Sequence, residues 1–322
     1  MIIEQALMNL PETMVGAGFG HKNYEGSIVS AFSLAILQSL NSRNIPNPMS
    51  CIIAEYAYER TKSKNLRVDL KISLGKTFLG TKAYSNYDFR FENFIEAKYY
   101  QLSQSATNTS KGNPTQNTVA VLKDIIRLIL LPTTTRKKNK SNIGRYFLHV
   151  YEGGDIGKHI SLKKRKGTTK RLWLENLTTQ GDFDIKLDDI KEDDYEWWKS
   201  LNISKLEINV TNYRISSIPI ANNQIQNTIY TYLLTRINSF SVCIGNGDYT
   251  LELDSSMSIK ESMSSATTIA DDNLFISTYP DFESLLSTSI KTKAAKTKAA
   301  KTKTAKTKTA IKTKANNYAK KN

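Results

Sequence analysis

The sequence predicts an α/β fold, with a central mixed β-sheet flanked by helices and a disordered basic C-terminal tail. Three observations support this prediction. Residues 66–74 (LRVDLKISL) alternate apolar and polar side chains, the period-two pattern of a half-buried strand. Residues 146–151 (YFLHVY) form a nearly continuous apolar run, as in a strand buried on both faces. Residues 291–322 repeat lysine-rich pentads with nothing apolar to bury, which predicts disorder.

The N-terminal part of the chain is predicted to supply two helices. Residues 1–25 form an N-terminal segment that is expected to be loosely ordered up to residue 23. Residues 26–41 carry apolar side chains at helical spacing, so a helix is predicted there, ended by the prolines of NIPNP. A second helix is predicted over 49–61; it would carry Glu55 and Glu59 into the strand at 66–74.

The middle of the chain reads as a strand, a helix and a second strand. FIEAKYY (94–100) is the first strand, TQNTVAVLKDIIRLILL (115–131) is the amphipathic helix, and 146–151 is the buried strand. This order predicts a right-handed crossover that places the strands at 94–100 and 146–151 in parallel.

The second half of the chain shows a weaker version of this strand–helix–strand pattern. LEINVTNYRI (206–215) is predicted as a strand, 222–240 as a helix and 241–245 as a strand, followed by a hairpin turn at GNGD (245–248). The acidic segment 182–196 and the basic segment 158–171 are expected to be solvated loops or insertions.

The polar faces of the two key strands carry the residues that suggest chemistry. Asp69 lies on the polar face of the first strand, and Glu96 and Lys98 project together from one face of the second. Two carboxylates and one ammonium can therefore converge on one point. Such a point suits a magnesium ion and phosphodiester chemistry.

A nuclease that uses a divalent metal needs hard oxygen ligands and a cation near the attacking water. Asp69 and Glu96 offer carboxylate ligands, the backbone carbonyl of Ala97 is a further ligand, and Glu55 could complete the cluster. Lys98 could orient or deprotonate the water and screen the phosphate. The expected cofactor is Mg²⁺ or Mn²⁺.

A helix with a glutamate, a strand with Asp69, the run Ile-Glu-Ala-Lys (95–98), a helix and an apolar strand together resemble the restriction-endonuclease-like, or PD-(D/E)xK, superfamily of nucleases. The resemblance covers roughly residues 26–151, and LKDIIRLILL (122–131) is similar to the helix that follows the motif in several such families. The proline usually written before the aspartate is Val68 here.

The resemblance implies a catalytic triad of Asp69, Glu96 and Lys98, with Glu55 as an accessory acid. It implies a restriction-endonuclease-like domain, which we place at 26–254, before a Ser/Thr-rich linker at 255–290. The expected activity is metal-dependent hydrolysis of nucleic acid by an endonuclease, with DNA as the expected substrate.

Alternatives remain open from the sequence. Asp69, Glu96 and Lys98 could form an exposed salt bridge of small energetic value on an ordinary sheet. Asp88 is a rival first carboxylate, although it lies in the turn-like run SNYD. The rival functions are a non-catalytic DNA-binding or nucleoid-associated protein of the same fold, and an interaction protein whose body has no nucleic-acid role.

The net charge of +15 is concentrated in the tail. Residues 291–322 hold twelve lysines and no acidic residue, so the remaining 33 basic and 30 acidic residues leave the body at only +3. Lysines at this spacing can follow phosphates without reading bases, which predicts non-specific tethering to nucleic acid. The expected nucleic-acid-binding residues are Lys291, Lys293, Lys296, Lys298, Lys301, Lys303, Lys306 and Lys308.

Composition argues against several other classes of protein. Cys51 and Cys243 are expected to be free thiols, and the three histidines do not show zinc-ligand spacing. Neither a secretory signal nor a transmembrane run is evident, so the expected protein is cytoplasmic, at the nucleoid if bacterial, with no membrane partner. Its expected partners are nucleic acid and, as one option, a second copy in a homodimer.

Overall fold

The computed structural model describes residues 2–16, 24–57, 67–74, 92–102, 113–129, 143–163, 171–191, 203–218, 220–221, 224–225, 228–244 and 247–251. The helices are α1 (Ile2–Gly16), α2 (Glu25–Asn41), η1 (Pro48–Cys51), α5 (Pro114–Ile129), η3 (Ile156–Lys158), α6 (Leu172–Thr178) and α7 (Leu187–Lys191). The strands are β1 (Ile52–Ala57), β2 (Arg67–Ser73), β3 (Glu92–Tyr100), β4 (Ile143–Glu152), β5 (Gly181–Lys186), β6 (Ile203–Ser217), β7 (Ile220–Ala221), β8 (Gln224–Ile225), β9 (Tyr230–Ile244) and β10 (Gly247–Leu251).

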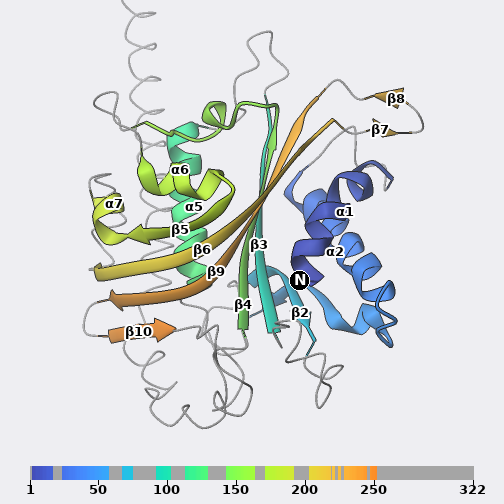
Figure 1. Ribbon diagram of the computed structural model, residues 1–322, viewed down its shortest axis with the longest axis horizontal. Helices are drawn as coiled ribbons and strands as arrows, with labels where there is room; N and C mark the ends of the chain where they lie inside the picture. Colours follow the sequence, from blue (N-terminus) through green and yellow to red (C-terminus); the bar gives the residue numbers. More distant parts are fainter. Residues whose placement is uncertain are drawn as a thin grey trace, which may run out of the picture.

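Among these residues one mixed sheet has eight strands, in the order β1-β2-β3-β4-β9-β6-β5, with β10 also paired to β9 (Figure 1). The strands β1, β2 and β3 pair antiparallel, and β3 then pairs in parallel with β4. Helix α5 supplies the connection that a parallel pair requires. The pairs β4–β9, β9–β6 and β6–β5 are again antiparallel.

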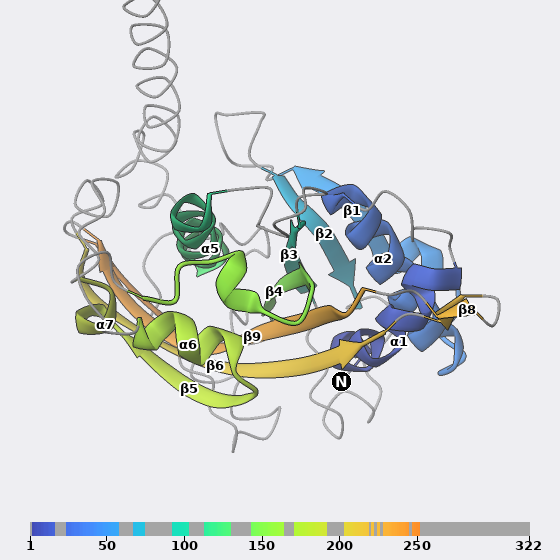
Figure 2. The same cartoon turned by 90° about the horizontal axis from the view of Figure 1, so that it is seen from above.

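Helices cover both faces of the sheet (Figure 2). Helices α1 and α2 lie on one face, over a core that includes Phe32, Leu148 and Tyr232. Helices α5, α6 and α7 lie on the other, over a core that includes Phe147 and Trp173. Two helical layers around one sheet are the expected way for strands to bury both faces.

Several predictions from the sequence are confirmed. The helix expected at 26–41 is α2, and its apolar stripe is buried. The helix expected at 115–131 is α5, and the strand expected at 146–151 is β4, which is buried along nearly its whole length. Strands β3 and β4 are parallel, and β9 pairs antiparallel with β10 on either side of residues 245–246, which lie outside the described residues. Both cysteines are free thiols.

The helix predicted at 49–61 is wrong for the residues that the structure describes. Pro48–Cys51 form one short 3-10 turn, and Ile52–Ala57 continue as strand β1, which pairs with β2. Alanine and glutamate favour a helix locally, but pairing with the neighbouring strand outweighs that small preference.

Other predictions also fail. Residues 2–16 are the helix α1, packed on α2, although a loosely ordered segment was expected. The helix predicted at 222–240 is instead mostly strand β9, and the acidic segment begins with strand β5 and helix α7. Glu59, Asp88, the linker at 255–290 and the lysine tail lie outside the described residues.

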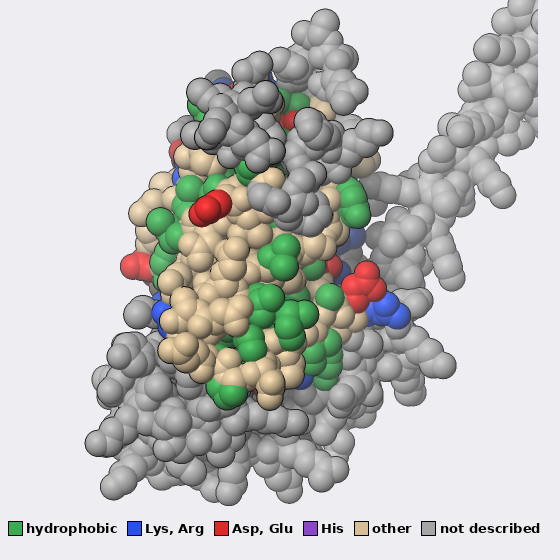
Figure 3. All heavy atoms as spheres, turned by 90° about the vertical axis from the view of Figure 1, so that its right-hand side faces the viewer, with side chains coloured by type: hydrophobic (Ala, Val, Ile, Leu, Met, Phe, Trp, Pro, Cys, Tyr) green, Lys and Arg blue, Asp and Glu red, His purple; other side chains and the backbone are tan. Residues whose placement is uncertain are grey.

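The outer face of α1 and α2 carries few charges (Figure 3). Residues 26–41 contain no charged side chain, and Met8, Leu34 and Met49 are exposed there or close by. No helix of the described part of the chain is long and apolar enough to cross a membrane.

Candidate active site where β2 and β3 diverge

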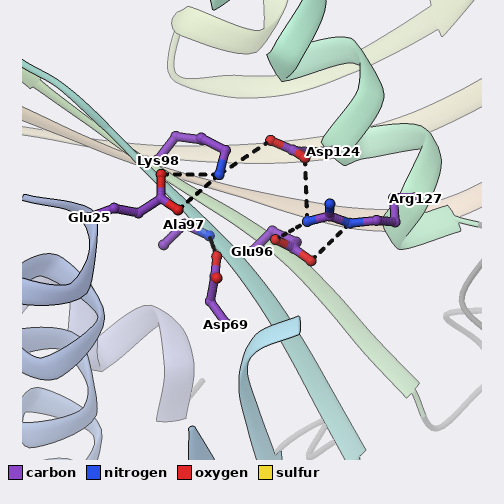
Figure 4. A network of polar contacts seen from close by, with 7 residues as sticks. All are labelled: Glu25, Asp69, Glu96, Ala97, Lys98, Asp124 and Arg127. Atoms are coloured by element: carbon purple, nitrogen blue, oxygen red, sulfur yellow. Dashed lines mark hydrogen bonds and ion pairs between the residues drawn. The ribbon is translucent and has the colours of Figure 1, made fainter. Parts of the chain in front are cut away.

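The candidate site lies where strands β2 and β3 part. Their pairing runs from Ser73–Glu92 to Leu70–Ile95 and ends there. The next residue of β2 is the half-buried Asp69, and its Oδ2 accepts a hydrogen bond of 2.7 Å from the backbone N–H of Ala97 (Figure 4). The aspartate side chain is thus fixed to the middle of the Glu-Ala-Lys run.

Glu96 is buried between β3 and α5. Its side chain is 1% exposed, and Arg127 on α5 donates from Nε to its Oε1 at 3.1 Å. Nη2 of the same arginine forms an ion pair with Oε2. The planar guanidinium therefore faces both oxygens of the carboxylate, the two-pronged contact at which arginine excels.

Lys98 connects the helices on the two faces of the sheet. Its Nζ lies 3.1 Å from both carboxylate oxygens of Glu25, the first residue of α2, and 3.7 Å from Oδ2 of Asp124 on α5. Asp124 Oδ1 lies in turn 3.4 Å from Nη2 of Arg127. Because β2 no longer pairs with β3 at this level, side chains from both layers can meet beside the strand.

These contacts join four carboxylates and two cations into one set, which we call the acid cluster. Its members are Glu25, Asp69, Glu96, Lys98, Asp124 and Arg127. With four carboxylates and two cations, the formal charges of these six side chains sum to −2. Excess negative charge in a partly buried set costs free energy unless a further cation or protons offset it.

Burial and mutual repulsion perturb the acids of the cluster. Burial raises the pKa of Glu96 well above its usual range; Arg127 opposes this effect, while Asp69 and Asp124 add to it. Burial also raises the pKa of Asp124, although Lys98 and Arg127 act in the opposite direction. Strongly perturbed acids with identifiable neighbours are typical of functional sites.

Lys98 remains a cation in this setting. Burial lowers the pKa of its ammonium, but the carboxylates of Asp124, Glu25 and Asp69 more than compensate, so the net pKa lies above the usual value. The arrangement therefore supports a role for Lys98 as a fixed positive charge rather than as a base.

The donor atoms suit a hard divalent cation. Oε2 of Glu96 and Oδ2 of Asp124 are buried, and each faces a cation: Oε2 faces Nη2 of Arg127, and Oδ2 lies 3.7 Å from Nζ of Lys98. Carboxylate oxygens are the ligands that Mg²⁺ and Mn²⁺ prefer. In the described residues, however, no three His, Cys, Asp or Glu side chains are grouped so that they could hold an ion as they stand. The expected set of Asp69, Glu96 and the Ala97 carbonyl has only two such side chains.

Glu55 does not lie where the sequence suggested. It sits on strand β1 with a positive φ of 49°, and its carboxylate pairs with Arg67 at 2.9 Å. The Glu55 side chain is 75% exposed. The predicted accessory role relied on a helix at a place where the structure has strand β1, and the structure gives no support to it.

Sequence reasoning missed Glu25, Asp124 and Arg127. Asp124 had a visible signal, because it falls three residues after Val121 and four before Leu128, within the buried stripe of α5. Glu25 had almost none, since acids are common in the first turn of any helix. The lysines of the tail cannot be placed, because they lie outside the described residues.

Comparisons with protein-family models, with curated proteins and with solved structures found no match to this chain.

Proposed function

We propose that this chain is a metal-dependent nuclease that hydrolyses phosphodiester bonds of nucleic acid, with DNA as the expected substrate. The observation that carries the proposal is the hydrogen bond from the Ala97 N–H to Asp69. It brings an aspartate of one strand to the residue between Glu96 and Lys98 of the next. An exposed salt bridge of an ordinary sheet would not bury Glu96 to 1% exposure.

The order of elements supports a restriction-endonuclease-like fold as part of the proposal. Helix α2, strands β1 to β3, helix α5 and strand β4 follow one another, and β3 and β4 are parallel. The resemblance called for a helix with a glutamate ahead of the aspartate strand. Glu25 at the start of α2 takes that accessory role in place of Glu55, because its carboxylate reaches Lys98.

Asp69, Glu96 and the Ala97 carbonyl would hold the Mg²⁺ or Mn²⁺ ion. When bound, the ion would supply a polarised phosphate and an activated water. Lys98 would contribute a fixed positive charge toward the phosphate, because its ammonium stays protonated among three carboxylates. Asp124 and Glu25 would hold that ammonium in place.

The test is cleavage of plasmid, single-stranded DNA and RNA with Mg²⁺ or Mn²⁺, and with chelator as the blank. The wild type is compared with the Asp69→Asn, Glu96→Gln and Lys98→Met proteins, which preserve side-chain shape. A matched control is Arg214→Met on β6, an exposed residue outside the acid cluster. Equal cleavage by the wild-type and Asp69→Asn proteins would show that another site, or a contaminant, does the chemistry.

One observation favours a second candidate, a DNA-binding protein of the same fold without catalysis. Arg127 and Lys98 already pair with the acids of the cluster, so the set could be purely structural. In that case DNA would bind without metal-dependent cleavage, and the Asp69→Asn protein would bind as the wild type does.

The lysine repeat is proposed as a tether that holds nucleic acid without reading its sequence. Deleting residues 291–322 should weaken binding to all sequences alike and flatten the slope of log K against log salt, because each neutralised phosphate releases a counterion. Fluorescence anisotropy from low to high salt measures this. If the truncated protein binds as tightly as the full chain at low salt, the tail is not a tether.

A further inference from the structure

Arg127 lies at the position where a metal ion would have to meet Glu96. Its guanidinium contacts both oxygens of that carboxylate, and Nη2 also lies 3.4 Å from Asp124 Oδ1. A cation with two acids around it is therefore already present on the α5 side of β3 (Figure 4).

A guanidinium and a divalent ion at the same carboxylate oppose each other. Both need its oxygen lone pairs, and two positive charges at such short range repel strongly in a partly buried place. The Arg127 side chain has access to solvent, because it is 25% exposed while that of Glu96 is 1% exposed. Arg127 can therefore move toward solvent more easily than Glu96 can.

Lys98 differs from Arg127 in its contacts. Its ammonium lies 3.1 Å from Glu25 and 3.7 Å from Asp124, and Glu96 takes part in neither ion pair. Lys98 can thus keep its partners while an ion joins Glu96. Arg127 cannot keep its two-pronged contact in the same way.

We propose that Arg127 is a resident counter-ion that competes with the divalent cation for Glu96 and so sets the metal affinity of the acid cluster. The inference rests on the proposed function, because it assumes that Glu96 is a metal ligand. Without metal the arginine stabilises the buried carboxylate; with metal it gives up that contact. The cluster then takes up the ion at the cost of an ion pair rather than by filling an empty site.

Equilibrium binding of Mn²⁺, followed by electron paramagnetic resonance of the free ion, tests this without any cleavage. The full chain is compared with Arg127→Met, which keeps the aliphatic stem, and Arg127→Lys, which keeps the charge but loses the planar fork. We expect at least tenfold tighter binding by Arg127→Met and a smaller gain by Arg127→Lys.

Two further variants separate competition from general electrostatics. Lys123→Met removes the same charge one turn earlier on α5, where the charge of Lys123 acts on Asp124. Arg214→Met removes it on β6. We expect less than threefold tighter binding for Lys123→Met and no change for Arg214→Met. An equal gain for Lys123→Met and Arg127→Met would overturn direct competition.

A second measurement follows an NMR resonance of the wild-type protein, so its result does not depend on how well a variant folds. The Nε–H of Arg127 donates to Glu96, so its ¹H–¹⁵N resonance should exchange slowly in chelator. Saturating Mg²⁺ should abolish this protection. The resonance is assigned by its absence from the spectrum of Arg127→Met.

The outcomes separate the two proposals. If the wild type binds Mn²⁺ in an Asp69-dependent way but Arg127→Met binds equally or more weakly, Arg127 holds Glu96 for the ion and only this inference fails. Retained protection of the Arg127 Nε–H in saturating Mg²⁺ leads to the same conclusion. If neither the wild type nor Arg127→Met binds Mn²⁺, the metal site itself is wrong and both proposals fail.

Discussion

Two polar clusters lie side by side in the sheet and differ in charge. Lys98 of the acid cluster is paired in register with His149 of β4. His149 is fully buried; its Nδ1 lies 3.0 Å from the Tyr151 hydroxyl and its Nε2 3.3 Å from Oγ1 of Thr235. We call His149, Tyr151 and Thr235 the neutral network.

The difference between the clusters lies in how well their charges are balanced. In the neutral network each ring nitrogen has a hydroxyl partner, and burial keeps the imidazole uncharged, with a pKa lowered to about 3. In the acid cluster the buried carboxylates of Glu96 and Asp124 pair with Arg127 and Lys98, and the four acids outnumber the two cations. A neutral, hydrogen-bonded network stabilises a fold, whereas an excess of one charge costs stability and is typical of functional sites.

The largest expected effect separates activity from stability at Lys98. Lys98→Met should reduce metal-dependent turnover by about 10²–10³-fold, the usual effect of removing one electrostatic contact to a transition state. DNA binding should change little, because the tail remains. Some stability should be lost, because Glu25 and Asp124 lose their cation, but the protein should stay folded at neutral pH. Single-turnover kinetics and urea denaturation of the same samples measure this. A collapse of stability in parallel with activity would mean that Lys98 is structural.

The neutral network should instead make the stability of the protein depend on pH. The folded-state pKa of His149 is depressed to about 3, so below about pH 6.5 the unfolded state takes up a proton that the folded state refuses. Stability is then lost as pH falls, by about 3 kcal/mol between pH 6.5 and 4 from this group alone.

His149→Phe removes this pH-dependent contribution to stability. It also leaves the hydroxyls of Tyr151 and Thr235 without their imidazole partner, which should lower the free energy of unfolding by about 1–3 kcal/mol at pH 7. Urea denaturation from pH 7 to 4 should show the two stability curves converging toward the acid end. Parallel curves would mean that His149 is charged in the folded protein.

The smallest expected effect is a change in the free energy of unfolding on substitution of Glu96, compared with a substitution in the neutral network. Glu96→Gln, studied in chelator at neutral pH, should raise the free energy of unfolding by about 1 kcal/mol, because a buried charge in excess is removed and the amide can still face Arg127. Thr235→Val in the neutral network should lower it by about the same amount. If Glu96→Gln destabilises the protein by more than Thr235→Val does, the acid cluster is a structural network.

The sequence is sufficient to predict an element where its apolar residues fit only one periodicity. The amphipathic stripe of α5 and the apolar run of β4 each allow one interpretation, and together they predict the parallel pair β3–β4. Strand β9 has buried residues on both faces, with Tyr232 and Leu234 on one and Leu233 on the other. A run that is apolar on every side does not reveal its period, which is why it was predicted as a helix.

The candidate site was predicted only in part because half of it comes from tertiary structure. Asp69, Glu96 and Lys98 could be found from strand alternation. Arg127 could be noted as a basic residue of α5, but its contact with Glu96 depends on how that helix packs against the sheet. Lys71 shows the same limit: alternation places it on a polar face, yet it is buried beside the rings of Tyr56 and Phe94.

Strand β9 also determines when the protein can become folded during its synthesis. It pairs with β4 on one side and with β6 on the other, so it completes the sheet between two parts of the chain that leave the ribosome earlier. At ordinary rates of translation β4 waits several seconds for that partner. During this time an apolar strand has a free edge, which invites aggregation. Nascent chains that end before Tyr230 should therefore need a chaperone, even though every residue of the acid cluster has already been made.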